Sequence, residues 1–276
     1  MKTTFMDSNA FFREYTSHEA IVKYTRATAG FGISYLLDHD YKKVYLEALG
    51  HLPKETRQRG IRMLEFGCGG GMNLIHLMAV LNQEGIRVEK ATGTDFSPVL
   101  IEAAKREAKN HLGDNYSSGL EFKVARNETL IKDLSASGEK TRPEGTFHFI
   151  LGVNTIRYCH AAKKELDCAR DIFKLLVPGG LCVAIDMNNR YPCFRSDLKN
   201  RLRRQKEEEC YVPSLDEYAA PFQKAGFELL RKEHFCWIPH SGGESMCRLF
   251  SMLSPLLNTV ARSRAMRSLV VARKPH

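Results

Sequence analysis

A glycine-spaced stretch near residue 70 most constrains what this chain can fold into. Met63, Leu64 and Phe66, with one acid among them, lead up to Gly67, Gly69 and Gly71, and a helical pattern of apolar residues begins at Leu74. This order predicts a buried strand that passes into a helix through a tight turn. Glycines tolerate positive φ and let a ligand approach the backbone, while the helix start offers unpaired N–H groups. We therefore predict a site for a nucleotide-like cofactor.

The loop lacks the features of two common phosphate-binding motifs. The dinucleotide fingerprint requires a further glycine three residues on, but Met72 stands at that position after Gly69, and Leu74 stands there after Gly71. A P-loop would end in Gly-Lys-Ser or Gly-Lys-Thr, and this loop continues with Met-Asn-Leu. A pyrophosphate is therefore not the expected ligand.

Two acids complete the pattern. Glu65 lies two residues before the first glycine, and Asp95 ends the next candidate strand. This combination resembles motif I and the following acidic strand end of class I S-adenosylmethionine-dependent methyltransferases. The resemblance implies that the loop Gly67–Gly71 lies against the methionine part of the cofactor, that Glu65 orients that part, and that Asp95 accepts the ribose hydroxyls. We expect the following residues to bind the cofactor: Glu65, Gly67, Cys68, Gly69, Gly71, Asn73, Asp95, Phe96, Arg126, Asn127, Asn154, Tyr24 and Arg26.

Arg126 departs from the family pattern. Many relatives have an acid at this position, where it contacts the adenine amino group, and arginine cannot accept that hydrogen bond. Asn127 or Glu128 could replace the acid, or Arg126 could stack on the adenine face.

Strands and helices alternate regularly after the glycine loop. The pattern predicts helices at 72–83, 97–111 and 161–176, and strands at 88–94, 120–125, 147–153, 181–187 and 267–273, with a breaker at 177–180. Such alternation favours a mostly parallel sheet with helices on both faces. The expected fold is a Rossmann-like methyltransferase fold with seven strands and an N-terminal helical cap.

The predicted organisation is a helical cap at 1–60 and a cofactor-binding domain at 61–276, with insertions at 189–212 and 240–263. Helical patterns at 18–24 and 33–49 flank a break at 25–32, and Tyr15, Tyr24 and Arg26 are candidate lid contacts. The first insertion carries a basic run and then an acidic run, typical of a charged, solvated helix. The second could close over the substrate side.

Chemistry is expected where the fourth strand ends, because ligands collect at the carboxyl ends of parallel strands. The Asn-Pro-Pro-Tyr motif of enzymes that methylate base amines and glutamine amides is absent there. Asn154, Tyr158 and His160 are the candidate catalytic residues, with His160 as general base because imidazole titrates near neutral pH. His240 and Asp186 are the alternative bases.

Composition sets the broad class. The chain has 276 residues, 43% of them hydrophobic, with a formal net charge of +9. Its eight cysteines show no zinc-ligand spacing and indicate buried thiols in a reducing compartment, so no metal is expected. No apolar run has the length of a membrane span and no signal-peptide core is visible. We predict a cytoplasmic protein without membrane or nucleic-acid partners; its oligomeric state is open.

The functional prediction is an S-adenosylmethionine-dependent methyltransferase. It would move a methyl group to an N, O or C atom of a small molecule by in-line displacement. Two alternatives remain: an RNA or protein methyltransferase that uses the basic insertion, and a non-catalytic cofactor-binding protein of the same fold.

Overall fold

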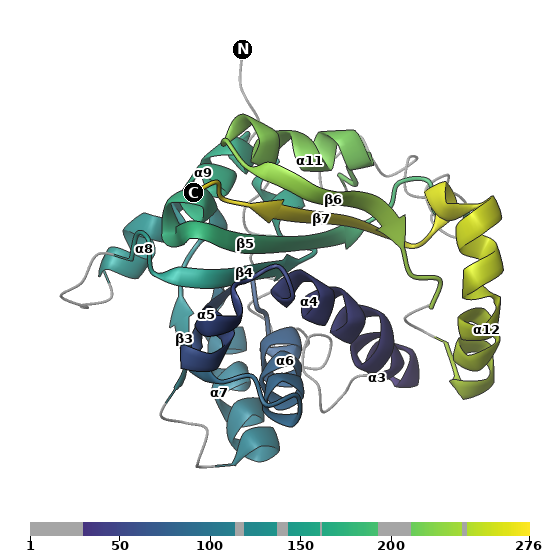
Figure 1. Cartoon of the computed structure of the whole chain (residues 1–276), viewed down its shortest axis with the longest axis horizontal. Coiled ribbons are helices and arrows are strands. Elements are labelled where there is room, and N and C mark those ends of the chain that lie inside the picture. The colour runs from purple at the N-terminus through teal and green to yellow at the C-terminus, as the bar shows by residue number, and fades with distance from the viewer. Residues whose placement is uncertain (1–29, 114–118, 137–142, 161, 193–210, 239–241) are drawn as a thin grey trace.

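A seven-stranded sheet forms the centre of the computed structural model (Figure 1), which describes residues 30–113, 119–136, 143–160, 162–192, 211–238 and 242–276. The strand order is β3-β2-β1-β4-β5-β7-β6. Strands β1 to β5 pair in parallel, and β7 runs antiparallel to both of its neighbours, β5 and β6. The strands are β1 (Ile61–Phe66), β2 (Val88–Asp95), β3 (Leu120–Val124), β4 (Phe147–Val153), β5 (Leu176–Met187), β6 (Glu228–Phe235) and β7 (Arg267–Arg273).

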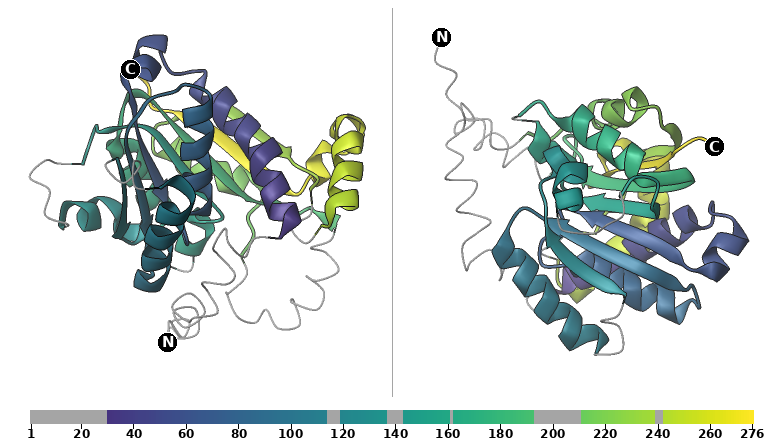
Figure 2. Two further views of the ribbon diagram at one scale, coloured as in Figure 1. Left: turned by 90° about the horizontal axis from the view of Figure 1, so that it is seen from below. Right: turned by 90° about the vertical axis from the view of Figure 1, so that its left-hand side faces the viewer.

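Helices cover both faces of the sheet (Figure 2). One core cluster joins the sheet to α4 (Lys42–Leu49), α6 (Met72–Gln83) and α7 (Pro98–Leu112). The other joins it to α8 (Leu130–Ala136), α9 (Glu165–Leu175) and α11 (Leu215–Lys224). The predicted mostly parallel sheet with helices on both faces is confirmed.

The central strands are apolar because helices cover them on both sides. In β5, Leu181, Val183 and Ile185 belong to one core cluster, and the alternating Cys182 and Ala184 belong to the other. A strand buried on both faces therefore reads as a continuous apolar run, which is how the sequence predicted it.

The predicted breaker at 177–180 follows the end of α9 at Leu175, but β5 begins at Leu176, five residues earlier than predicted, so the breaker lies inside the strand. Phe147 pairs with Leu176, and Phe149 pairs with Leu181, so β5 has more residues than β4 over this stretch. Gly179 takes a positive φ of 76° within the resulting irregularity. The strand therefore begins at Leu176 and passes through a bulge, at the place where the sequence predicted the break between the helix and its strand.

The N-terminal part of the described chain is a helical segment of three consecutive elements: α3 (Phe31–Leu36), the π-helical turn η2 (Leu37–Tyr41) and α4. The predicted break at 25–32 is wrong at its end, because the helix begins at Phe31. Tyr45 and Leu49 of α4 are fully buried against the sheet. The predicted helix at 18–24 and the candidate contacts Tyr15, Tyr24 and Arg26 lie outside the described residues.

The two predicted insertions differ in what the structure describes. Residues 193–210 of the first, and His240 in the second, lie outside the described residues. Most of the second insertion forms α12 (Glu244–Val260), which lies at one end of the molecule beside α3 (Figure 1). The short helix α5 (Lys54–Arg59) leads into β1. Among the described residues, no helix is long and apolar enough to cross a membrane.

Candidate active site

The glycine loop takes a backbone conformation that favours glycine. Gly67, Gly69 and Gly71 have φ values of 65°, 54° and 80°, all in the left-handed region. A Cβ on Gly67 would lie 2.4 Å from Cγ2 of Thr155, which follows β4. The loop is therefore packed against the end of the fourth strand, and its backbone N–H groups lie beside the start of α6.

Glu65 lies one residue before the end of β1, and its side chain is fully buried. Its Oε1 accepts a hydrogen bond from Asn73 Nδ2 at 3.2 Å, and its Oε2 accepts one from the Leu74 backbone N–H at 3.0 Å. Burial nevertheless raises the pKa of Glu65 to about 8. A cation held beside this carboxylate would favour its charged form.

Asp95 connects the glycine loop to the start of α7. Its Oδ2 accepts a hydrogen bond from the Gly69 N–H, and its Oδ1 accepts one from the Ser97 N–H, both at 2.9 Å. Each carboxylate oxygen has a second lone pair, so both oxygens can still accept a hydrogen bond from a hydroxyl group. Burial raises the pKa of Asp95 above its ordinary value, and the backbone N–H groups of Ser97, Gly69 and Phe96 act against this rise.

The other predicted cofactor residues differ in position. The Cys68 thiol is buried and its pKa is raised well above the ordinary value, so it acts as packing rather than as a nucleophile. The Asn127 amide lies 3.3 Å from where a Cβ on Gly67 would stand. Phe96 is half-buried and Arg126 is exposed, with the Arg126 backbone N–H donating to Asp133 at 2.9 Å.

A second group of polar side chains lies where β4, β5 and β7 meet. We name it the Asp186 cluster and define it as Asn154, Arg157, Tyr158, Asp186 and Arg267. Asp186 is fully buried at the end of β5, and its Oδ1 accepts from the Met187 N–H and lies 3.6 Å from Arg157 Nε. Its Oδ2 has no hydrogen-bond partner among the described residues. Burial raises the pKa of Asp186, while Arg157 lowers it.

Two arginines tie the predicted residues Asn154 and Tyr158 to this cluster. Arg267, buried at the start of β7, donates from Nη1 to Asn154 Oδ1 at 2.8 Å. Arg157 donates from Nη2 to the Tyr158 hydroxyl at 2.9 Å. Asn154 has a positive φ of 56°, uncommon for a residue other than glycine, and such strain gathers at functional sites.

Tyr41 brings the N-terminal helical segment to the same place. Its hydroxyl is buried with no hydrogen-bond partner among the described residues, and its pKa is raised by burial, with Arg267 and Asp186 among the charges that act on it. Sequence reasoning assigned no site role to Tyr41, Arg157 or Arg267. The one signal was an arginine at the start of β7, shortly before the apolar run 269–272.

His160, the preferred base from the sequence, has different surroundings. Its ring is exposed, Nδ1 forms an ion pair with Glu165, and the ring stacks on Tyr211 with centroids 3.5 Å apart. Among the described contacts of His160, none joins it to Asn154 or Asp186. The structure therefore brings Asn154, Tyr158 and Asp186 together and places His160 in another set of contacts.

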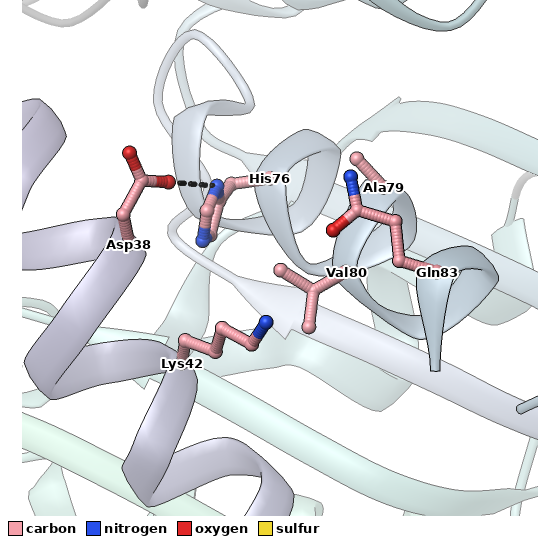
Figure 3. A pocket seen from close by; sticks show the side chains of 6 residues that line it. All are labelled: Asp38, Lys42, His76, Ala79, Val80 and Gln83. Atoms are coloured by element: carbon pink, nitrogen blue, oxygen red, sulfur yellow. Dashed lines mark ion pairs between the residues drawn. The ribbon is translucent and has the colours of Figure 1, made fainter. Parts of the chain in front are cut away.

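A small polar pocket of about 280 Å³ lies between the N-terminal helical segment and α6 (Figure 3). Asp38 and Lys42 line one side, and His76 and Gln83 line the other. The His76 ring forms an ion pair with Asp38 at 3.5 Å. No residue of the glycine loop or of the Asp186 cluster lines this pocket, so it is separate from both.

Comparison with known proteins assigns the family. A family model described as a methyltransferase domain matches residues 37–232. This match includes the glycine loop, Asp95 and four of the five residues of the Asp186 cluster. The chain belongs to the methyltransferase domain family, and its cofactor is S-adenosylmethionine.

Individual relatives are distant. The chain is 27% identical over 158 residues to a ubiquinone biosynthesis O-methyltransferase of Cereibacter sphaeroides, covering 57% of this chain and 54% of that protein. It is 28% identical over 132 residues to a citrinin polyketide synthase of Monascus purpureus, covering 48% of this chain and 4% of that protein. The chain thus spans about half the length of the O-methyltransferase and only a small part of the polyketide synthase.

A solved structure confirms the fold. An S-adenosylmethionine-dependent methyltransferase from Mesorhizobium loti superimposes with a TM-score of 0.53 at 17% identity, covering 86% of this chain and 99% of that one. At this identity the likeness concerns the fold alone.

The residues present suit the cofactor. The glycine loop offers backbone donors, Glu65 is a buried carboxylate suited to an ammonium, and Asp95 offers two acceptor oxygens suited to a diol. The described residues include no group of three or more His, Cys, Asp or Glu side chains that could hold a metal ion.

Proposed function

We propose that this protein methylates an oxygen or carbon atom of a small molecule, with Asp186 as the general base. The observation that carries this proposal is the buried Asp186 carboxylate, whose Oδ2 has no partner among the described residues. A buried carboxylate oxygen without a partner is costly in a folded protein, so a ligand that donates a hydrogen bond there would relieve the cost.

The names of two relatives support this class of substrate. One is an O-methyltransferase of ubiquinone biosynthesis and the other is a polyketide synthase. For this chain we propose phenols and carbon acids between two carbonyl groups as the acceptor classes. Both classes must lose a proton before or during methyl transfer, whereas an amine requires only orientation and desolvation.

The predicted cofactor-binding residues bind and orient S-adenosylmethionine. When bound, S-adenosylmethionine supplies a methyl group on a sulfonium, which is already activated and leaves a neutral thioether. We infer that Glu65 faces the cofactor ammonium and that Asp95 accepts hydrogen bonds from the ribose hydroxyls. Asn127, whose amide lies near Gly67, supports the adenine side in place of the family's acid.

The Asp186 cluster would handle the proton of the acceptor. The ionised Asp186 would take the acceptor proton on Oδ2, which would leave the acceptor atom with the electron pair of the broken O–H or C–H bond. Arg157 stabilises the ionised form before the transfer, because it lies 3.6 Å from Oδ1. Asn154, held by Arg267, and Tyr158, held by Arg157, would position the acceptor.

Three earlier predictions remain open. The assignment of His160 as base is less favoured, because this side chain is exposed and paired with Glu165. An RNA or protein substrate would use the basic insertion, whose residues 193–210 lie outside the described part of the chain. A cytoplasmic, reducing location is our inference from the six described cysteines, which are all free and buried.

The decisive experiment compares Asp186→Asn with the unaltered protein. Transfer of labelled methyl from S-adenosylmethionine is first screened over small phenols and 1,3-dicarbonyl compounds. With the best acceptor, Asp186→Asn should lower kcat by about 100-fold or more, while affinity for S-adenosylhomocysteine changes less than about two-fold. Asp216→Asn, an exposed carboxylate on α11, is the matched control and should leave kcat unchanged.

Two results would contradict the proposal. Full kcat in Asp186→Asn would exclude Asp186 as base. Methyl transfer to RNA or protein, with none to any small acceptor, would exclude the small-molecule class.

A further inference from the structure

Helix α12 presents an apolar surface outward. Six of its side chains are between 39% and 80% exposed although all are large and hydrophobic. They follow one another at helical spacing and so form a single stripe. We name them the α12 stripe: Met246, Leu249, Met252, Leu253, Leu256 and Val260.

The opposite face of α12 holds the helix in place with a mixture of apolar and polar contacts. Cys247 is buried, and Asn258 Oδ1 accepts a hydrogen bond of 2.8 Å from the Trp237 indole. Phe250, Leu257, Ser251 and Ser254 are also only partly exposed and lie on this face. The outward face is therefore at least as apolar as the inward face, unlike the outward face of an ordinary surface helix.

The charges around the stripe are positive in sum. Residues 244–264 contain three arginines and one acid, Glu244. Arg248 pairs with Glu244 and Arg262 pairs with Glu233, while Arg264 is exposed with no ion pair among the described residues. The whole chain carries a formal charge of +9.

We propose that the α12 stripe docks this protein onto an anionic lipid surface. An amphipathic helix with an apolar face and flanking arginines is suited to lie in the plane of a membrane whose headgroups are negative. Such docking needs no spanning helix. The helix is about 25 Å long at 1.5 Å per residue, enough for several side chains to enter the headgroup region together.

Charge favours lipid over a second copy of this chain. Pairing two stripes would bring together two segments 244–264 that each contain three arginines and one glutamate, in two molecules that each carry +9. Like charges across an interface oppose association, whereas an anionic surface attracts both the arginines and the molecule as a whole.

The position of α12 fixes the orientation of the docked protein. The helix connects β6, which runs parallel to β5, to the antiparallel β7, so it lies at the edge where the parallel strands end (Figure 1). Asp95 and Asp186 end strands at this same edge. A lipid surface bound by the stripe would lie on the side of the molecule that holds the candidate site.

The test is flotation of the full chain with vesicles. We expect it to bind phosphatidylcholine vesicles with about 30 mol% phosphatidylglycerol at least ten-fold better than neutral phosphatidylcholine vesicles at about 0.1 M NaCl. The double variant Leu249→Glu with Leu256→Glu should lose about ten-fold or more of this binding. The control Asn82→Glu with Gln223→Glu makes the same change in net charge at exposed polar positions of α6 and α11, and should keep binding within about two-fold.

The single tryptophan verifies that the variant is folded. Trp237 is bonded to the inner face of α12, so its fluorescence should be the same in both double variants. Equal binding to neutral and anionic vesicles, equal loss in the control, or no vesicle binding at all would overturn the proposal. A dimer that dissociates on Leu249→Glu with Leu256→Glu, without vesicle binding, would instead identify a second copy as the occupant.

Discussion

The two polar regions of this site are assembled from different distances along the chain. In the glycine-loop region, Glu65 bonds to a backbone N–H nine residues away and Asp95 to one 26 residues away. In the Asp186 cluster, the hydrogen bond between Asn154 and Arg267 spans 113 residues. Local motifs build the first region, and the sheet topology builds the second.

The two regions also differ in how fully their polar groups are satisfied. Both oxygens of Glu65 and both oxygens of Asp95 accept hydrogen bonds from the chain. In the Asp186 cluster, Asp186 Oδ2 has no partner among the described residues, and neither has the nearby Tyr41 hydroxyl. The cofactor region is therefore organised in advance, whereas the cluster leaves hydrogen-bonding capacity for a ligand.

Among the variants that test this difference between the two regions, Asp95→Ala is expected to have the largest effect on cofactor affinity. Loss of two charge-assisted hydrogen bonds to the ribose should weaken S-adenosylhomocysteine binding by about 100-fold, at about 1.5 kcal/mol for each bond. Calorimetric titration measures this affinity. Asp167→Ala, an exposed carboxylate on α9, is the control. A loss below about three-fold for Asp95→Ala would show that the ribose is held elsewhere.

A smaller, pH-dependent effect should distinguish Glu65. Its raised pKa of about 8 means that the cofactor-free protein carries a proton there at neutral pH. An ammonium bound beside it would lower this pKa, so binding releases a proton and affinity rises with pH. Between pH 6 and 8 we expect an increase of about 25-fold, because Glu65 ionises over this range while about half of the cofactor amine has lost its charge at pH 8.

Calorimetry in buffers of different ionisation enthalpy measures this proton release. Glu65→Gln carries no titratable group and should bind with little dependence on pH over the same range. Equal proton release in both proteins would place the ammonium away from Glu65.

The smallest effect is expected from His160→Ala. Because the ring is exposed and its ion pair with Glu165 is solvated, its removal should lower kcat by less than about three-fold at any pH. The measurement is a pH–rate profile with the acceptor found by screening. A loss near 100-fold would restore His160 as base and would break the assignment of proton transfer to the Asp186 cluster.

The sequence predicted the sheet well because its signals are local. Helix α6 and strands β4 and β7 begin and end at the predicted residues. The start of β5 was not predicted, because Leu176 pairs with Phe147 of β4 on the near side of the irregular residues 177–180, and this pairing depends on the sheet. The residues of the glycine loop were readable from their spacing, whereas Arg157 and Arg267 were not, because their partners are set by sheet order.

Some sequence predictions are neither confirmed nor contradicted by the structure. The division into a cap at 1–60 and a domain at 61–276, and the roles of individual site residues, are still predictions. The family model begins at residue 37, inside the predicted cap. The segment Phe31–Leu49 packs into the same core as the sheet, so its helices are also part of that core.

The place of β7 has a consequence for folding. This strand comes after every other strand in the chain, yet it lies inside the sheet, between β5 and β6. Strands β1, β2 and β3 can pair once residue 124 has left the ribosome, whereas β6 cannot join the sheet until residues 267–273 are available. Contacts of such long sequence separation slow folding. We therefore expect the cofactor region to gain protection from hydrogen exchange before the Asp186 cluster does during refolding.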